Sequence, residues 1–130
     1  MQRHISKVLA LGLLLLAQPA AAQFYSPDGR NVQDELVTIA RVKVSAQGGI
    51  TFDDKSVSQA ELELALDRLK HVNGAVLYFR ESAGGIAPDS AMAAFRAILA
   101  ADLPVSLSTK PDFSDYVDPQ GKVHTRPPNL

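Results

Sequence analysis

Apolar residues recur at helical spacing in two segments of the chain, and both segments carry the signals of helix ends. The first follows Ser58, which has the spacing of a capping box with Glu61, and it stops at Asn73-Gly74. The second runs from about residue 88 to residue 101 and is opened by Pro88. Each apolar stripe predicts an amphipathic helix. The stripes consist of Leu62, Ala65, Leu66, Leu69 and Val72 in the first helix, and of Ala91, Met92, Phe95, Ile98 and Leu99 in the second.

Short β-branched or apolar stretches around the two helices predict strands. Gly48-Gly49 permits a tight reversal after the first of them, and Asp53-Asp54 supplies a second turn. The last two strands are joined through the second helix, so they form one parallel β-α-β crossover. The predicted strands cover residues 35–44, 50–52, 55–57, 75–79 and 105–109.

These elements predict an α+β fold, a two-layer sandwich with both helices packed on one face of a mixed sheet of about four to five strands. Alternation along the strands assigns side chains to the two faces. The face under the helices is expected to carry Val42, Val44, Leu77, Phe79, Val105 and Leu107. The opposite, uncovered face is expected to carry Arg41, Lys43, Tyr78, Arg80, Ser106 and Ser108. One face is then apolar and the other polar.

The first 22 residues have the pattern of a secretory signal peptide. Arg3, His4 and Lys7 precede an apolar run, and small residues at A-x-A spacing end at Ala22. A membrane span needs about 20 apolar residues, whereas Pro19 interrupts this run earlier. We therefore expect cleavage after about Ala22 and a periplasmic product without a stable membrane span. The alternatives are secretion from the cell and an uncleaved N-terminal anchor.

The rest of the chain divides into a leader, one domain and a tail. Residues 23–34 are polar and contain a β-turn with proline and glycine. Residues 35–109 hold all the predicted helices and strands. Residues 110–130 are rich in proline and aspartate and have neither a helical nor a strand period. We expect a partly disordered tail, with Phe113 and Tyr116 holding its first part against the domain. The same two aromatic residues are also candidates for contact with a ligand or partner.

Composition and charge indicate one small globular domain and argue against nucleic acid as a partner. The 130 residues are 46% apolar and 21% charged, which is typical of one small globular domain. When Arg3 and Lys7 leave with the signal, 11 basic residues remain beside 14 acidic ones. This acidic balance lacks the electrostatic footprint of a nucleic-acid-binding protein. The chain has no cysteine, so an exported domain of this size would be held by its core alone.

No residue pattern predicts a catalytic, metal or cofactor site, so we expect a protein that is not an enzyme. Nucleophilic catalysis would need a histidine beside a serine or threonine. Beyond the signal, the sequence has only His71, on a predicted helix surface, and His124, in the tail. Asp112, Asp115 and Asp118 repeat every three residues, whereas a calcium-binding EF-hand loop spaces its carboxylates by two. A solvated acidic turn is the preferred interpretation.

The uncovered sheet face is the best candidate for a binding surface. Arg41, Lys43 and Arg80 around Tyr78 could hold an anionic ligand such as a carboxylate-bearing glycan or peptide. The same residue types are also common at solvent-facing strand positions, where they need no ligand. The Gly84-Gly85 loop before the second helix is a weaker anion candidate, because it lacks a phosphate-binding motif.

Four stretches carry a resemblance to a known family. They are AQGGI at residues 46–50, VSQAEL at 57–62, VLY at 76–78 and LPVSLST at 103–109. In this order, and across residues 36–109, the chain resembles the periplasmic domain of the ExbD/TolR biopolymer-transport family. Members of that family are anchored by one transmembrane helix, whose aspartate serves proton flow with ExbB/TolQ-type partners. No acidic residue lies between Val8 and Ala22, so proton transport is not carried over to this chain.

The resemblance implies a domain that dimerises and contacts TonB/TolA-type proteins or, in the TolR branch, peptidoglycan. We therefore expect a soluble, non-enzymatic protein of the periplasm that is accessory to a transport or envelope system. It would contact a protein partner in the cell envelope, or its own copy in a homodimer, through the sheet edge, the alanine-rich side of the second helix or the tail. The alternative function is the binding of peptidoglycan or another anionic ligand by the uncovered sheet face.

Overall fold

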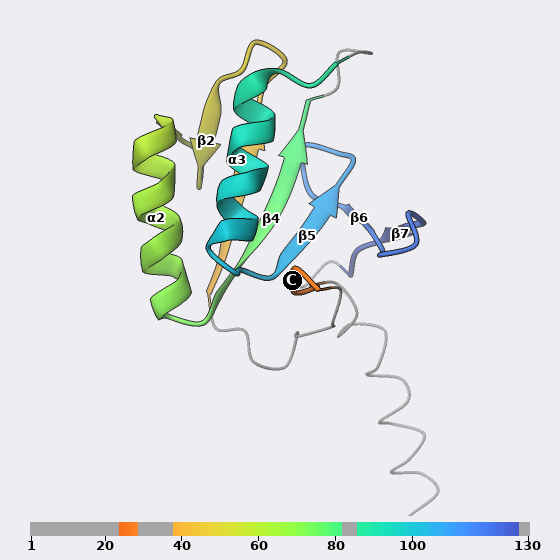
Figure 1. Ribbon diagram of the computed structural model, residues 1–130. Coiled ribbons are helices and arrows are strands. Elements are labelled where there is room, and N and C mark those ends of the chain that lie inside the picture. Colours follow the sequence, from red (N-terminus) through yellow and green to blue (C-terminus); the bar gives the residue numbers. More distant parts are fainter. Residues whose placement is uncertain (1–23, 29–37, 82–85, 128–130) are drawn as a thin grey trace, which may run out of the picture.

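The described residues form a seven-stranded sheet with two helices on one of its faces (Figure 1). The structure is a computed structural model and describes residues 24–28, 38–81 and 86–127. The strand order is β3-β2-β1-β4-β5-β6-β7. The predicted α+β class is confirmed, although the sheet is wider than expected. The elements are β1 (Thr38–Val44), β2 (Ile50–Phe52), β3 (Lys55–Val57), α2 (Gln59–His71), β4 (Gly74–Arg80), α3 (Asp89–Ala100), β5 (Val105–Ser108), β6 (Asp115–Val117) and β7 (Val123–Thr125).

β4 is the central strand and runs parallel to both of its neighbours. It aligns with β1 from Thr38 opposite Gly74 to Val44 opposite Arg80, and Val76 lies opposite Val105 of β5. The predicted crossover from β4 through α3 to β5 is confirmed. β1 reaches β4 by a second parallel connection through β2, β3 and α2. The other strand pairs are antiparallel.

The hairpin between β2 and β3 has a two-residue turn. Asp53 and Asp54 both have positive φ, 49° and 70°, and Phe52 pairs with Lys55. Positive φ at both central positions is the geometry of a type I′ turn, which matches the twist of the flanking strands. Aspartate tolerates this conformation because its side chain can bond to nearby backbone. The turn predicted at these residues is confirmed.

α2 begins and ends where its sequence signals predict. The Ser58 hydroxyl accepts a hydrogen bond from the Glu61 amide at 3.1 Å, and the Glu61 carboxylate accepts one from the Ser58 amide at 2.8 Å. At the other end, Asn73 adopts the left-handed conformation with φ of 54°. Gly74 follows because a Cβ there would lie 2.2 Å from Cδ1 of Leu69. Both hydrogen bonds of the capping box predicted at Ser58 and Glu61 are therefore formed, and the helix ends at the predicted Asn73-Gly74.

The predicted stripe of α3 is confirmed in part: Ala91 and Ile98 are buried and Phe95 packs against the core, but the contact face is shifted toward Ala94. Its buried residues are Ala91, Ala94 and Ile98, whereas Met92 and Leu99 are 46% and 37% exposed. The prediction that Met92 and Leu99 face the core is therefore wrong. Alanine is small enough to let the helix approach the sheet closely, so the contact face follows alanine positions that hydrophobicity alone does not distinguish.

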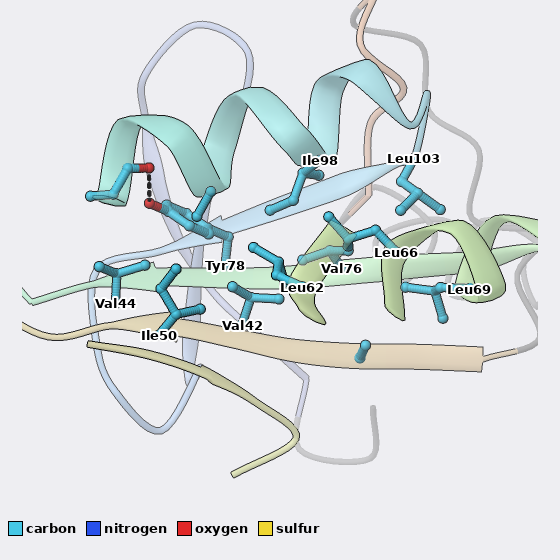
Figure 2. Close-up of a cluster of buried hydrophobic side chains, with 13 residues drawn as sticks. Val42, Val44, Ile50, Leu62, Leu66, Leu69, Val76, Tyr78, Ile98 and Leu103 are labelled. Atoms are coloured by element: carbon cyan, nitrogen blue, oxygen red, sulfur yellow. Dashed lines mark hydrogen bonds between the residues drawn. The ribbon is translucent and has the colours of Figure 1, made fainter. Parts of the chain in front are cut away.

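The larger of the two apolar cores lies between the helices and the sheet (Figure 2). It joins the helix-facing side chains of the central strands to the apolar stripes of α2 and α3. Full burial of each leucine or isoleucine in it is worth about 1.5–3 kcal/mol. Its buried members are Ala40, Val42, Val44, Ile50, Leu62, Leu66, Leu69, Val76, Tyr78, Ala91, Ala94, Ile98 and Leu103.

A second apolar cluster covers the opposite face of the sheet, which was expected to be open. It consists of Phe24, Ala75, Leu77 and Phe113, with Ile39 and Phe79 packed against it. Phe24 comes from the predicted leader, and the neighbouring Tyr25 bridges to Val105 by two backbone hydrogen bonds of 3.1 and 2.8 Å. The leader and the tail therefore fold back over the face that the helices leave uncovered.

Part of the predicted tail belongs to the sheet. β6 pairs with β5 through Leu107 and Val117, and β7 pairs with β6 over three residues. The expectation that residues 110–130 lack strands is therefore wrong. β6 and β7 are too short to show a strand period, because alternation needs about four residues or more to be recognised, and unlike β2 and β3 they do not follow a longer strand across a predicted turn.

The predicted signal peptide, residues 1–22, lies outside the described residues. Within the part of the chain that the structure describes, no helix has the length and apolar character of a membrane span.

Replacing Ser58 with alanine is expected to lower the free energy of unfolding by about 1 kcal/mol, because the cap hydroxyl of α2 is lost. Urea denaturation followed by circular dichroism measures the change. Ser56→Ala is the matched control, since Ser56 is an exposed residue of the adjacent strand β3. Its effect should stay within about 0.5 kcal/mol. Equal losses in the two variants would contradict the assigned capping role.

Candidate functional site

The structure divides the four candidate binding residues of the sheet, Arg41, Lys43, Tyr78 and Arg80, between its two faces. Tyr78 and Arg80 are aligned with Val42 and Val44 in the parallel register, so they share the helix-facing side. Arg41 lies opposite Leu77 on the other side of the sheet. The predicted grouping of these four residues is therefore not formed. The cause is that β4 is apolar at nearly every position, so its sequence contains no alternation that fixes its faces.

Tyr78 is a core residue. It is 7% exposed, its hydroxyl donates to the carbonyl oxygen of Ala91 at 3.1 Å, and its ring lies 5.4 Å from that of Phe95. Burial raises the pKa of the Tyr78 hydroxyl, and the charge of Arg80 opposes this in part. The side chain thus ties β4 to the first turn of α3 and is not placed to meet a ligand on the opposite face.

Phe113 and Tyr116 pack against the domain, as the sequence predicts. Phe113 is 4% exposed within the second cluster, and the ammonium group of Lys43 lies 5.7 Å from its ring centroid. Its backbone is left-handed with φ of 57°, which is uncommon for an aromatic residue. Tyr116 is buried and stacks on His124 at 5.0 Å. Both aromatics therefore contribute to packing, and Phe113 also contacts a predicted site residue.

Arg126 is the buried cation of this face, and no pattern in the sequence indicates its role. Its Nε donates to the carbonyl oxygen of Phe113 at 2.8 Å. Its Nη2 lies within 2.8–3.1 Å of three acceptors, the hydroxyls of Ser106 and Ser108 and the carbonyl oxygen of Asp115. The guanidinium carbon lies 6.0 Å from the ring centroid of Phe24 and 5.5 Å from that of Tyr116. One side chain thus connects the leader, β5 and the tail.

The electrostatics of Arg126 reflect this burial. Desolvation lowers the pKa of its guanidinium, the nearby Asp115 and Tyr116 raise it, and the positive charge of Arg41 lowers it further. Asp115 is itself buried and accepts hydrogen bonds from the amide and hydroxyl of Thr109. Of these influences on the pKa of Arg126, that of Arg41 is the smallest, and the burial of Arg126 is the largest.

Arg41 and Arg126 both line a cleft of about 320 Å³ on this face. The cleft opens between β1 and the tail, above Leu77, and Phe113 and Asp112 contribute to its wall. Among the described residues, no carboxylate lies within ion-pair distance of the Arg41 side chain, which is exposed. The cleft therefore presents one solvated guanidinium group beside a buried one.

The three aspartates of the tail serve the local fold in three different ways. Asp112 accepts from the amide of Ser114 at 3.0 Å, and Asp115 holds Thr109. Asp118 accepts from two amides of the β6–β7 turn and bonds to Nε2 of His124 at 2.8 Å. That histidine contact is the main cause of the lowered pKa of the Asp118 carboxyl. Within the described residues, no group of three or more acidic, histidine or cysteine side chains has the arrangement of a metal site.

A groove of about 280 Å³ lies at the other side of the sheet, between α2 and the first half of β1. One wall is the α2 stripe of Ala65, Arg68, Leu69 and Val72, and the other consists of Thr38, Ala40, Phe52 and Asp53. The sequence analysis placed Val72 in the buried stripe, but it is 49% exposed. The groove is open because β2 covers only the last three residues of β1.

Replacing Arg126 with alanine is expected to lower the free energy of unfolding by about 3 kcal/mol, because several buried acceptors lose a charged donor at once. Arg126→Lys should recover only part of the loss, since an ammonium group cannot reproduce the planar fork. Arg41→Ala, on the same cleft, should change stability by less than about 0.5 kcal/mol. Urea denaturation measures all three, and similar losses for Arg41 and Arg126 would contradict the roles assigned here.

A scan against protein-family models and a search of curated proteins both find no match to this chain. The function is therefore argued from the chain's own residues.

Proposed function

We propose that the chain is an exported, non-enzymatic interaction domain of the cell envelope that acts through contacts with a protein partner. The observation that carries this proposal is the groove beside β1. An open strand edge next to apolar side chains is a surface that folded proteins normally cover, because it pairs readily with other chains. Here Val72 is half exposed beside Phe52 and Leu69.

Two further features support the same proposal. The signal-like pattern of residues 1–22 is typical of an exported chain. The order of elements between residues 36 and 109 resembles the periplasmic domain of the ExbD/TolR family, whose members act by contacting envelope proteins. On this proposal the chain is accessory to a transport or envelope system, and a second copy is one of the partners to be tested.

The proposal predicts that the partner in the producing cell contacts the groove and not the outer side of α2. Val72→p-benzoylphenylalanine places a photo-crosslinking group in the groove, whereas Leu64→p-benzoylphenylalanine places it on an exposed position outside it. After irradiation of intact cells, the first variant should give one dominant cross-linked product and the second much less. Mass spectrometry of the product distinguishes a second copy from a different protein. Equal cross-linking by the two variants, or none, would overturn the proposal.

A second candidate function is the binding of an anionic ligand, peptidoglycan included, in the cleft of Arg41 and Arg126. The specific observation in its favour is that two guanidinium groups approach one cleft while Arg41 has no carboxylate partner among the described residues. An anion in the cleft would lie near both positive charges, and planar guanidinium groups suit carboxylates. Leu77 and Phe113 would provide an apolar floor for such a ligand.

Co-sedimentation with purified cell-wall sacculi tests this second function. The wild-type chain should be retained at low salt and released as salt increases, because the contact is electrostatic. Arg41→Ala should abolish retention, whereas Arg96→Ala, an exposed arginine on α3, should not. Retention that is indifferent to Arg41→Ala would show that the cleft is not the binding site.

A further inference from the structure

The edge of β1 that faces away from β4 is only partly covered. Lys43 pairs with Thr51 of β2, and the Asp53 amide donates to the carbonyl oxygen of Arg41 at 2.8 Å. Backbone groups of alternate residues point to the same side of a strand. The amide and carbonyl of Ile39 therefore point the same way as those of Arg41, away from β4. Among the described residues, no strand is paired with them.

The β2–β3 turn is what stops the pairing at Arg41. Asp53 leaves the line of β2 with positive φ, and its carboxylate, not its carbonyl, accepts the hydrogen bond from the Arg41 amide at 2.8 Å. β3 then runs back along the outer side of β2 and never reaches the first half of β1. The open edge at Ile39 is therefore fixed by a defined turn.

The groove beside this edge has the shape and chemistry for the side chains of an added strand. A strand on the edge of β1 would point every second side chain toward the helix layer. There it would meet Ala65, Leu69 and Val72 of α2 and the ring of Phe52. These are apolar contacts, and the exposed Val72 would gain the burial that it lacks.

The groove wall carries two charged side chains, Asp53, whose carboxylate accepts from the Arg41 amide, and Arg68. Lys70 of the same helix pairs with Asp102 at 3.5 Å, and Lys43 pairs with Asp54 at 3.8 Å. Within the described residues, Arg68 forms no ion pair. Since it lies on the helix side of the groove, a carboxylate that meets it would stand on the same face of the added strand as the apolar side chains.

We propose that the groove between β1 and α2 binds an extended segment of a partner protein, which adds as a strand to the open edge at Ile39. The segment carries apolar side chains at alternate positions and an acidic side chain, on that same face, that pairs with Arg68. This inference rests on the proposed function, and it specifies the binding mode and the chemistry of the partner. Main-chain hydrogen bonds would provide the anchoring, and the pockets for alternate side chains would provide the selectivity.

Fluorescence anisotropy with the purified chain tests the binding mode without the partner. The probe is a fluorescein-labelled peptide of sequence Asp-Thr-Val-Thr-Val-Thr-Asp, whose acidic ends make it indifferent to strand direction. Saturable binding is expected. Val72→Asp should weaken it at least about tenfold, and Leu64→Asp, at an exposed apolar position of α2 outside the groove, should leave it unchanged. Thermal unfolding of both variants verifies that they are folded.

Two peptide variants separate strand addition from mere apolar contact. Methylation of the backbone nitrogens of the three threonines or of the two valines removes the amides on one edge of the peptide, and one of these two peptides should lose binding while the other keeps it. A peptide with lysine in place of both aspartates should bind weakly to the wild type and better to Arg68→Glu. Absence of saturable binding, or equal binding of the two methylated peptides, would overturn the inference.

The outcomes distinguish the binding mode from the proposed function. A Val72 cross-link in cells together with no peptide binding would overturn strand addition and leave the protein-partner function standing. Peptide binding without any cross-link in cells would support the groove chemistry and count against the proposed function.

Discussion

The apolar character of β4 on both of its faces is the constraint on which the rest of the structure depends. Val76 and Tyr78 point into the helix layer, and Ala75 and Leu77 point to the opposite side. A strand of this kind is stable only when both faces are covered. The helices cover one face, and segments from the two ends of the chain cover the other. The two-layer sandwich therefore also has a small apolar cluster on the sheet face away from the helices.

Arg126 allows the leader and the tail to pack on the sheet face away from the helices. The outward face of β5 presents two buried hydroxyls: that of Ser108 donates to the carbonyl oxygen of Asp115 at 2.9 Å, and that of Ser106 needs a partner beneath an apolar layer. The guanidinium group of Arg126 supplies donors to both and to two carbonyl oxygens of the tail. Its planar faces lie near Phe24 and Tyr116, so the same group satisfies polar atoms and packs against rings. The tail is ordered through this network, with Asp115 as the nearby counter-charge.

The molecule has two candidate binding surfaces of different character, the cleft beside Arg41 and the groove beside β1. On the tail side, the cleft beside Arg41 is polar at its mouth and is built by segments that converge only in the folded chain. On the helix side, the groove beside β1 is mainly apolar and is defined by one short hairpin. Proteins usually protect an exposed strand edge with charge, proline or a covering segment. The edge at Ile39 is bordered instead by the apolar stripe of α2, which is why it is the stronger candidate for a protein contact.

The sequence by itself determined the features that depend on near neighbours along the chain. The capping box at Ser58, the turn at Asp53-Asp54 and the crossover from β4 to β5 follow from residues that lie close in sequence. The tertiary structure decided which face of β4 carries Tyr78, because an unbroken apolar strand has no alternation to read and its register is set by β1 and β5. It also decided the order of the tail and the role of Arg126. These depend on contacts between Phe24, Ser106 and Arg126, residues that are far apart in the sequence and have no local signal.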